Sequence, residues 1–215
     1  MTRNHRAIAI STLVAAAFLF AVARPITAQE ENPAKEKFQQ DLKSAVLNGS
    51  ITGPQLKEIQ QNLEVLKAAK SATPGGPVDL MTPYTAISKI RGIMATVKEP
   101  DQTTLRQDFK LMMATRQPAP STEPETPGKK LGKDIFSAVM KGEPTPDQVQ
   151  SLQQSLNSLE SLKGSSDGGL KKLRTLKEAK SQISQTVNSP NFRPEDTQTV
   201  LADLNNLGPQ GRGGV

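Results

Sequence analysis

The chain has 215 residues with a net charge of +6, one histidine, no cysteine and no tryptophan. Without cysteine there is neither a disulfide nor a lipid-modified cysteine, and a structural zinc site lacks its usual ligands. The single histidine, His5, lies in the first 28 residues. Because the rest of the chain lacks the base of a Ser-His-Asp or Cys-His site, we expect a protein that is not an enzyme and holds no metal or cofactor.

Residues 1–28 have the pattern of an export signal. Arg3 and Arg6 precede an apolar run of 17 residues, 7–23, and the segment ends in the small residue Ala28. We expect cleavage after Ala28 and a periplasmic or secreted protein. The alternative is a retained anchor, because 17 residues is the lower limit for a membrane-spanning helix. In that case the chain contacts a membrane only through this segment.

The charge that remains after cleavage is small. Loss of the signal removes three arginines and lowers the net charge from +6 to +3. The remaining charges of both signs are well mixed, and one tyrosine with a few phenylalanines offers little surface on which bases can stack. Neither feature matches a nucleic-acid interface. We expect a protein partner or an envelope component, and no nucleic acid.

The next residues predict a first helical unit. We expect residues 29–37 to be disordered and residues 38–116 to form four helices. Gly49 ends the first helix in a left-handed cap, and the second helix opens with a capping box, Thr52 and Gln55, in which each side chain satisfies the N–H of the other residue. Apolar residues at helical spacing mark the buried faces of the second, third and fourth helices: Leu56, Ile59, Leu63, Leu66, Ile87, Ile90, Met94, Val97, Leu105, Phe109 and Met112. The third helix is expected to open at Thr82-Pro83 by the rule that a capping residue precedes proline.

Residues 134–159 repeat residues 41–66, with eleven of 26 positions identical. We therefore expect residues 131–207 to form a second four-helix unit. The Pro-rich stretch 117–130 is predicted to be an extended linker, which favours separate lobes. The Gly-rich tail, 208–215, is expected to be disordered. The predicted fold is all-α, with two tandem four-helix units.

The second unit retains the local signals of the first. Thr145 and Gln148 form a second capping box, and Gly142 ends the preceding helix. The dipeptide Thr186-Val187 matches Thr96-Val97 at an offset of 90, which makes the break before the third helix of this unit three residues shorter than its counterpart.

Residues 49–56 resemble the second half of an EF-hand loop that runs into its exit helix. The resemblance implies paired helix–turn–helix elements. A calcium loop placed on residues 44–55 needs carboxylates, above all a bidentate Glu at its last position, where Gln55 stands and where Gln148 stands in the second copy. We expect loosely EF-hand-like units without calcium ligands. A degenerate calcium-responsive protein is the alternative.

The capping boxes also resemble the Thr-x-x-Gln motif of the Spy-like periplasmic chaperones, which are small, exported, helical and basic. That resemblance implies chaperone-like binding. The leucine that precedes the threonine in that family is replaced here by Ile51 and Pro144. The tandem plan with a Pro-rich linker also departs from the arrangement of that family, so the resemblance covers the motif alone.

Two groups of polar residues are candidates for partner binding. Amide side chains bind backbone groups of another chain, and a basic helix that also carries leucines suits an anionic membrane or envelope polymer. The candidates are Gln60, Gln61, Gln153, Gln154, Lys171, Lys172 and Arg174. We expect an exported, non-enzymatic interaction or adaptor protein, with chaperone-like binding as one form of it and binding to an envelope or membrane surface as an alternative.

Catalysis by carboxylates alone is the remaining enzymatic alternative. Asp41 and Asp108 recur as Asp134 and Asp203. Nothing in the sequence places a second carboxylate beside these recurring aspartates. We therefore expect no acid–base site, and we expect the negative charge of Asp41 near the start of its helix to interact favourably with the helix dipole.

Overall fold

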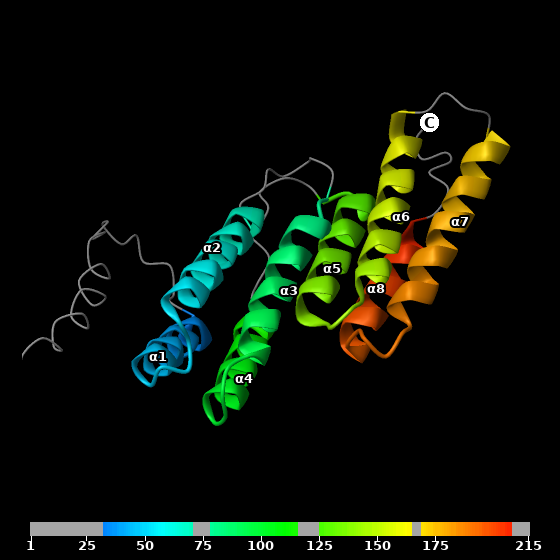
Figure 1. The fold of residues 1–215 in the computed structure, drawn as a ribbon. Coiled ribbons are helices and arrows are strands. Elements are labelled where there is room, and N and C mark those ends of the chain that lie inside the picture. The colour runs from blue at the N-terminus through cyan, green and yellow to red at the C-terminus, as the bar shows by residue number, and fades with distance from the viewer. Residues whose placement is uncertain (1–31, 71–77, 116–124, 165–168, 208–215) are drawn as a thin grey trace, which may run out of the picture. The chain divides into compact units, whose positions relative to one another are not determined.

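The computed structural model describes residues 32–70, 78–115, 125–164 and 169–207, all of which belong to a single compact unit. The predicted signal, 1–28, and the predicted tail, 208–215, lie outside these residues. The described part is all-helical, as predicted, with no strand (Figure 1). Its helices are α1 (Pro33–Leu47), α2 (Gly53–Lys70), α3 (Met81–Ala95), α4 (Asp101–Ala114), α5 (Pro127–Lys141), α6 (Pro146–Gly164), α7 (Gly169–Val187) and α8 (Pro194–Asn206).

Helix α1 begins five residues earlier than the sequence predicts. The side chain of Asn32 accepts the backbone N–H of Ala34 at 3.0 Å, and Pro33 occupies the first helical position. Ala34 is buried together with Phe38. Residues 33–37 are therefore helical rather than disordered, because an asparagine cap followed by proline starts a helix even in a polar segment.

The same signal shortens the predicted linker. Thr126 accepts the N–H of Lys129 at 3.4 Å, and Pro127 opens α5. The last four residues of the predicted linker 117–130 are thus helical, and residues 117–124 lie outside the described ranges. At α3 the N-cap residue is Leu80 instead of Thr82, and the Asp79 carboxylate before it accepts the N–H groups of Met81 and Thr82 at 3.0 and 3.2 Å.

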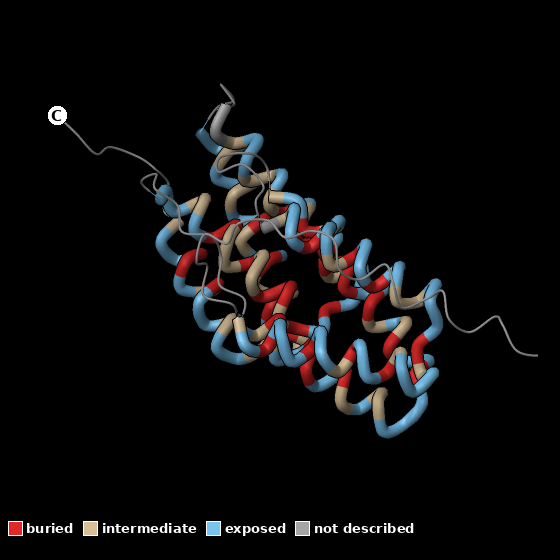
Figure 2. The backbone as a smooth tube through the Cα atoms, turned by 90° about the vertical axis from the view of Figure 1, so that its left-hand side faces the viewer, coloured by how far each residue is buried: buried red, intermediate tan, exposed pale blue. Residues whose placement is uncertain are grey.

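The helices pack in matched pairs around two apolar clusters. Helix α1 packs on α4 and α2 on α3, and in the same way α5 packs on α8 and α6 on α7. Buried residues follow the inner faces of these helices (Figure 2). The rings of Phe38 and Phe109 join α1 to α4 with centroids 5.5 Å apart. All four residues of the predicted α3 face, Ile87, Ile90, Met94 and Val97, are buried.

Helix α3 also packs against the second group of helices. It contacts both α5 and α6, and α4 contacts α5. Leu80, just before α3, is fully buried in the cluster formed by α5 to α8. Met140 on α5 is in turn buried in the cluster formed by α1 to α4. The linker composition favoured separate lobes, whereas these reciprocal apolar contacts join α1–α4 to α5–α8.

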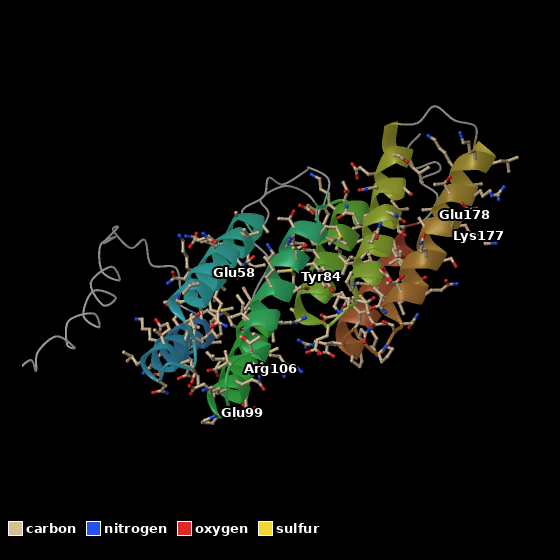
Figure 3. The ribbon with its side chains drawn as sticks, viewed as in Figure 1. Glu58, Tyr84, Glu99, Arg106, Lys177 and Glu178 are labelled. Carbon is tan, nitrogen blue, oxygen red and sulfur yellow. The ribbon has the colours of Figure 1, made fainter. Side chains whose placement is uncertain are left out.

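Polar contacts fix this junction between α3 and α5–α6. The hydroxyl of Tyr84 donates to the carbonyl of Pro144 at 3.0 Å, and Figure 3 shows Tyr84 on α3. Arg91 donates from Nη2 to the carbonyl of Gly142 at 3.0 Å. At Gly132 a Cβ would lie only 2.8 Å from Cγ2 of Val78, so α5 approaches residue 78 as closely as glycine allows. We call these contacts the junction.

Candidate functional site

Two aspartates and one lysine meet between α1 and α4. Lys37 Nζ donates to Asp41 Oδ2 at 2.8 Å and to Asp108 Oδ1 at 2.6 Å. Asp41 lies one turn after Lys37 on α1, and Asp108 comes from α4, where only 5% of its side chain is exposed. A second carboxylate therefore does lie beside Asp41, contrary to the sequence prediction.

The same arrangement occurs between α5 and α8. Lys130 Nζ donates to Asp134 Oδ2 at 2.8 Å and to Asp203 Oδ1 at 2.5 Å. The side chain of Asp203 is 4% exposed, and its Oδ2 has no hydrogen-bond partner among the described residues. We call each set of one lysine and two aspartates a Lys–Asp–Asp cluster.

The pKa values of the two carboxyl groups in the first cluster are shifted in opposite directions. Burial raises the pKa of Asp108, and the neighbouring Asp41 adds to that increase. The hydrogen bond with Asp108, followed by the bond from Lys37, lowers the pKa of Asp41. In the second cluster burial raises the pKa of Asp203, again with a contribution from the adjacent aspartate.

Opposed carboxyl pKa values are one mark of acid–base sites, but buried ion-pair networks produce them too. In each cluster the lysine bonds to both carboxylates and joins the first helix of a group to the fourth. Within the described ranges, no three His, Cys, Asp or Glu side chains gather in a way that could hold a metal ion. The geometry of the clusters suits helix pairing.

The first predicted capping box is confirmed and extends to a third residue. Thr52 N–H donates to Gln55 Oε1 at 2.9 Å, and Gln55 N–H donates to Thr52 Oγ1 at 3.4 Å. The amide nitrogen of Gln55 also donates to Thr96 Oγ1 at 3.0 Å, which ties α2 to the end of α3. Because the Gln55 oxygen serves the cap, it is not directed at a calcium position in the preceding loop.

The second capping box has the same form. Thr145 N–H donates to Gln148 Oε1 at 2.8 Å, and Gln148 N–H donates to Thr145 Oγ1 at 3.3 Å. Gln148 Nε2 donates to Ser189 Oγ at 2.8 Å, at the end of α7. These glutamines have a structural task at the ends of the paired helices.

Gln153, one of the candidate binding residues, binds the backbone of a non-helical segment of its own chain. Its Oε1 accepts the N–H of Leu80 at 2.7 Å, and its Nε2 donates to the carbonyl of Val78 at 2.8 Å. Residues 78–80 have no helical structure, so their backbone groups are available to the amide. The side chain of Gln153 is thus part of the junction.

The other candidate glutamines lie on the surface. Gln60 and Gln61 on α2 are exposed, as is Gln154 on α6. Gln61 borders a surface hollow of about 520 Å³ between α2 and α3. Figure 3 shows Glu58 of this hollow on α2. The remaining lining residues are Pro54, Lys57, Asn62, Val65 and Lys89.

The candidate basic residues lie in the first turns of α7. Lys171 and Arg174 are exposed, and Lys172 is half-buried. Arg174 Nε donates to Glu178 Oε1 at 2.8 Å. The structure places these cations on a different helix hairpin from Gln60 and Gln61, so the candidate residues form two separate groups.

None of the helices in the described ranges combines the length and apolar character that crossing a membrane requires. No family model matches the chain, and it matches no curated protein and no solved structure. The fold defines an all-helical bundle protein, and its function has to be inferred from the geometry of its own residues.

Proposed function

We propose that this protein is an exported, non-enzymatic adaptor made of two tandem four-helix units, α1–α4 and α5–α8. The duplication is supported by hydrogen bonds that occur at corresponding positions in α1–α4 and in α5–α8. In each unit one lysine bonds to two aspartates, and one glutamine links a capping threonine to a hydroxyl 41 residues later. These shared polar groups hold helices together, so partner binding is assigned to surfaces that they do not occupy.

One contact carries the proposal about the binding mode. The Gln153 amide bonds both to the N–H of Leu80 and to the carbonyl of Val78, in the non-helical segment just before α3. Gln60 is the matching residue of the repeat, and it is exposed on α2. An amide both donates and accepts, so Gln60 can bind the backbone of a non-helical partner segment in the way that Gln153 binds residues 78–80.

The hollow between α2 and α3 supports partner binding at the surface around Gln60 and Gln61. It borders Gln61, next to Gln60, and it contains the apolar side chain of Val65 between charged residues of both signs. A non-helical segment of a protein partner fits a surface on which exposed amides lie beside a shallow groove. One native partner makes the protein an adaptor, and many unfolded clients make it chaperone-like.

The test is capture from an envelope extract with the chain from Gln29 onward, which contains all the described helices. Wild-type protein should retain one stoichiometric partner or a spread of unfolded clients, and the double variant Gln60→Ala/Gln61→Ala should lose them. Gln107→Ala, an exposed glutamine of α4, is the matched control. Equal capture by wild type and the double variant would show that these amides do not bind the partner.

Two further measurements address the remaining parts of the proposal. The exported protein should begin at Gln29 when its N-terminus is sequenced, and a chain that still begins at Met1 would indicate a retained anchor. Calorimetric titration with calcium should give no heat of binding, since the oxygens of Gln55 and Gln148 are used by the capping boxes. A fitted calcium site would replace the adaptor with a calcium-responsive protein.

A further inference from the structure

The outer end of the α6–α7 hairpin carries six leucines, and none of them is buried. In α7 the buried residues begin only at Ala179. Leu170 is 86% exposed and Leu173 is 48% exposed. Leu162 and Leu176 are half-buried, and Leu156 and Leu159 pack against the cluster of α5 to α8. Contact of apolar side chains with water is unfavourable, so Leu170 and Leu173 present an apolar surface that the described residues leave uncovered.

The corresponding end of α2–α3 is covered. Leu80 enters the cluster of α5 to α8, where it is fully buried, and Tyr84 is buried beside it. The position that matches Leu80 in the proposed repeat, 93 residues later, is Leu173. Among the described residues, no other helix pair covers the hairpin end of α6–α7 in the way that α5–α8 cover the end of α2–α3.

The hairpin end is also positively charged. Residues 170–178 contain four cations, Lys171, Lys172, Arg174 and Lys177, against one acid, Glu178. Figure 3 labels Lys177 and Glu178 on α7. Glu178 is paired with Arg174 at 2.8 Å. On the packed helix α6, Glu160 is a further acid, so the cations remain in excess over the whole end.

We propose that the hairpin end docks on an anionic lipid surface, with Leu170 and Leu173 in the headgroup–acyl boundary and the lysines beside the phosphates. This inference rests on the adaptor proposal and adds the surface on which the adaptor is held. The two leucines lie three residues apart on one helix, so they share a face. Long cationic side chains beside them can keep their charges in the headgroup layer while the leucines insert.

Insertion can be followed by fluorescence because the chain contains no tryptophan. We expect Leu170→Trp to shift to shorter wavelength with vesicles of phosphatidylethanolamine and phosphatidylglycerol, and not with phosphatidylcholine alone. Leu47→Trp is the matched control, since Leu47 is 87% exposed on α1. No shift at position 170, or an equal shift at both positions, would overturn the proposal.

Charge reversal tests the role of the lysines. Lys171→Glu/Lys172→Glu/Lys177→Glu should reduce binding to the anionic vesicles at least about tenfold, because each cation near an anionic surface adds to the attraction. A triple reversal at exposed lysines of the other unit changes the net charge equally and should leave binding within about twofold: Lys35→Glu, Lys98→Glu and Lys110→Glu. Helix content by circular dichroism should be unchanged in both. If both triple variants lost vesicle binding equally, net charge alone would explain the binding, and the proposal of a defined site on α7 would be refuted.

Other occupants give different results. A shift at Leu170→Trp that grows with protein concentration without lipid would identify a second copy on this end. A shift produced only by an envelope protein fraction would identify an acidic protein. Either outcome overturns the lipid proposal. Capture by Gln60 and Gln61 is measured separately on α2, so the adaptor proposal can fail while vesicle binding succeeds, and the reverse.

Discussion

Replacement of Gly132 by alanine tests the junction at a single atom. The added Cβ would lie 2.8 Å from Cγ2 of Val78, where ordinary contacts are 3.4–4 Å. Forcing an extra methyl group into such a contact costs about 1–3 kcal/mol. Alanine in a helix interior is favoured over glycine by about 1 kcal/mol. Gly132→Ala should therefore range from neutral to about 2 kcal/mol less stable than wild type.

Gly92 provides the matched control on α3. A Cβ at that position meets no atom within 4 Å, so Gly92→Ala should stabilise the chain by about 1 kcal/mol through helix propensity alone. The two variants should differ by about 1–3 kcal/mol in the free energy of unfolding. Urea unfolding followed by circular dichroism at about pH 7 measures both, under the usual linear extrapolation.

A second substitution shows whether Val78 is the neighbour concerned. Val78→Ala removes Cγ2, so it should make Gly132→Ala less costly than it is in the wild-type background. If Gly132→Ala stabilises the chain as much as Gly92→Ala does, the added Cβ meets nothing. Helix α5 then does not approach Val78, and the description of the junction is wrong.

Three further predictions concern the junction and the clusters. Gln153→Ala should cost about 1–2 kcal/mol, because it leaves two partly buried backbone groups without their partner. Gln60→Ala at the exposed matching position should stay within about 0.5 kcal/mol; equal unfolding midpoints would contradict this. Tyr84→Phe should cost about 1 kcal/mol through the lost bond to a buried carbonyl, and an unchanged midpoint in urea would show that the hydroxyl makes no such bond. Because the pKa of Asp203 is raised in the folded chain, its contribution to stability is present below the ordinary value of 3.8 and is lost as pH rises through the folded value. Asp203→Asn abolishes this titration, so the stability of the variant relative to wild type should increase between about pH 3.5 and 7; a flat or falling difference would refute the raised pKa.

The features predicted best from the sequence are those set by neighbouring residues. Gly49 has φ of 69° and ends α1 as predicted. Both capping boxes form, because the groups that bond lie three residues apart. The missed starts of α1 and α5 were local too. The capping residue and proline at Asn32-Pro33 and Thr126-Pro127 start these helices although the surrounding composition is polar or rich in proline.

The Lys–Asp–Asp clusters depend on contacts far apart in the chain. Lys37 and Asp108 are 71 residues apart, and no local rule brings them together. A signal was present, since Lys37 and Lys130 are separated by the same 93 positions as Asp41 and Asp134. Extending the repeat four residues toward the N-terminus would have identified the lysines, although not the helix pairing that completes each cluster.

The offset between α3 and α7 differs from the predicted one. The dipeptide match set α7 at an offset of 90 from α3. The hydroxyls bonded by Gln55 and Gln148 lie 41 residues beyond each glutamine, which keeps the offset at 93. Buried Ile90 then matches buried Ile183. Helix α6 ends at Gly164 and α7 begins at Gly169, whereas α2 ends at Lys70 and α3 begins only at Met81. The break before α7 is thus shorter, as predicted, although the register stays at 93.

The junction has a further consequence under the proposed duplication. It joins different faces of the two units, and a contact of that type does not close on itself, so its repetition would produce an open filament. Positions 93 residues apart show how growth is stopped at each end. On one face of the junction, Gly132 corresponds to Gln39, and on the other, Tyr84 corresponds to Lys177. A bulkier side chain and an added charge at these positions would oppose the addition of a third unit, as polar end repeats do in solenoid proteins.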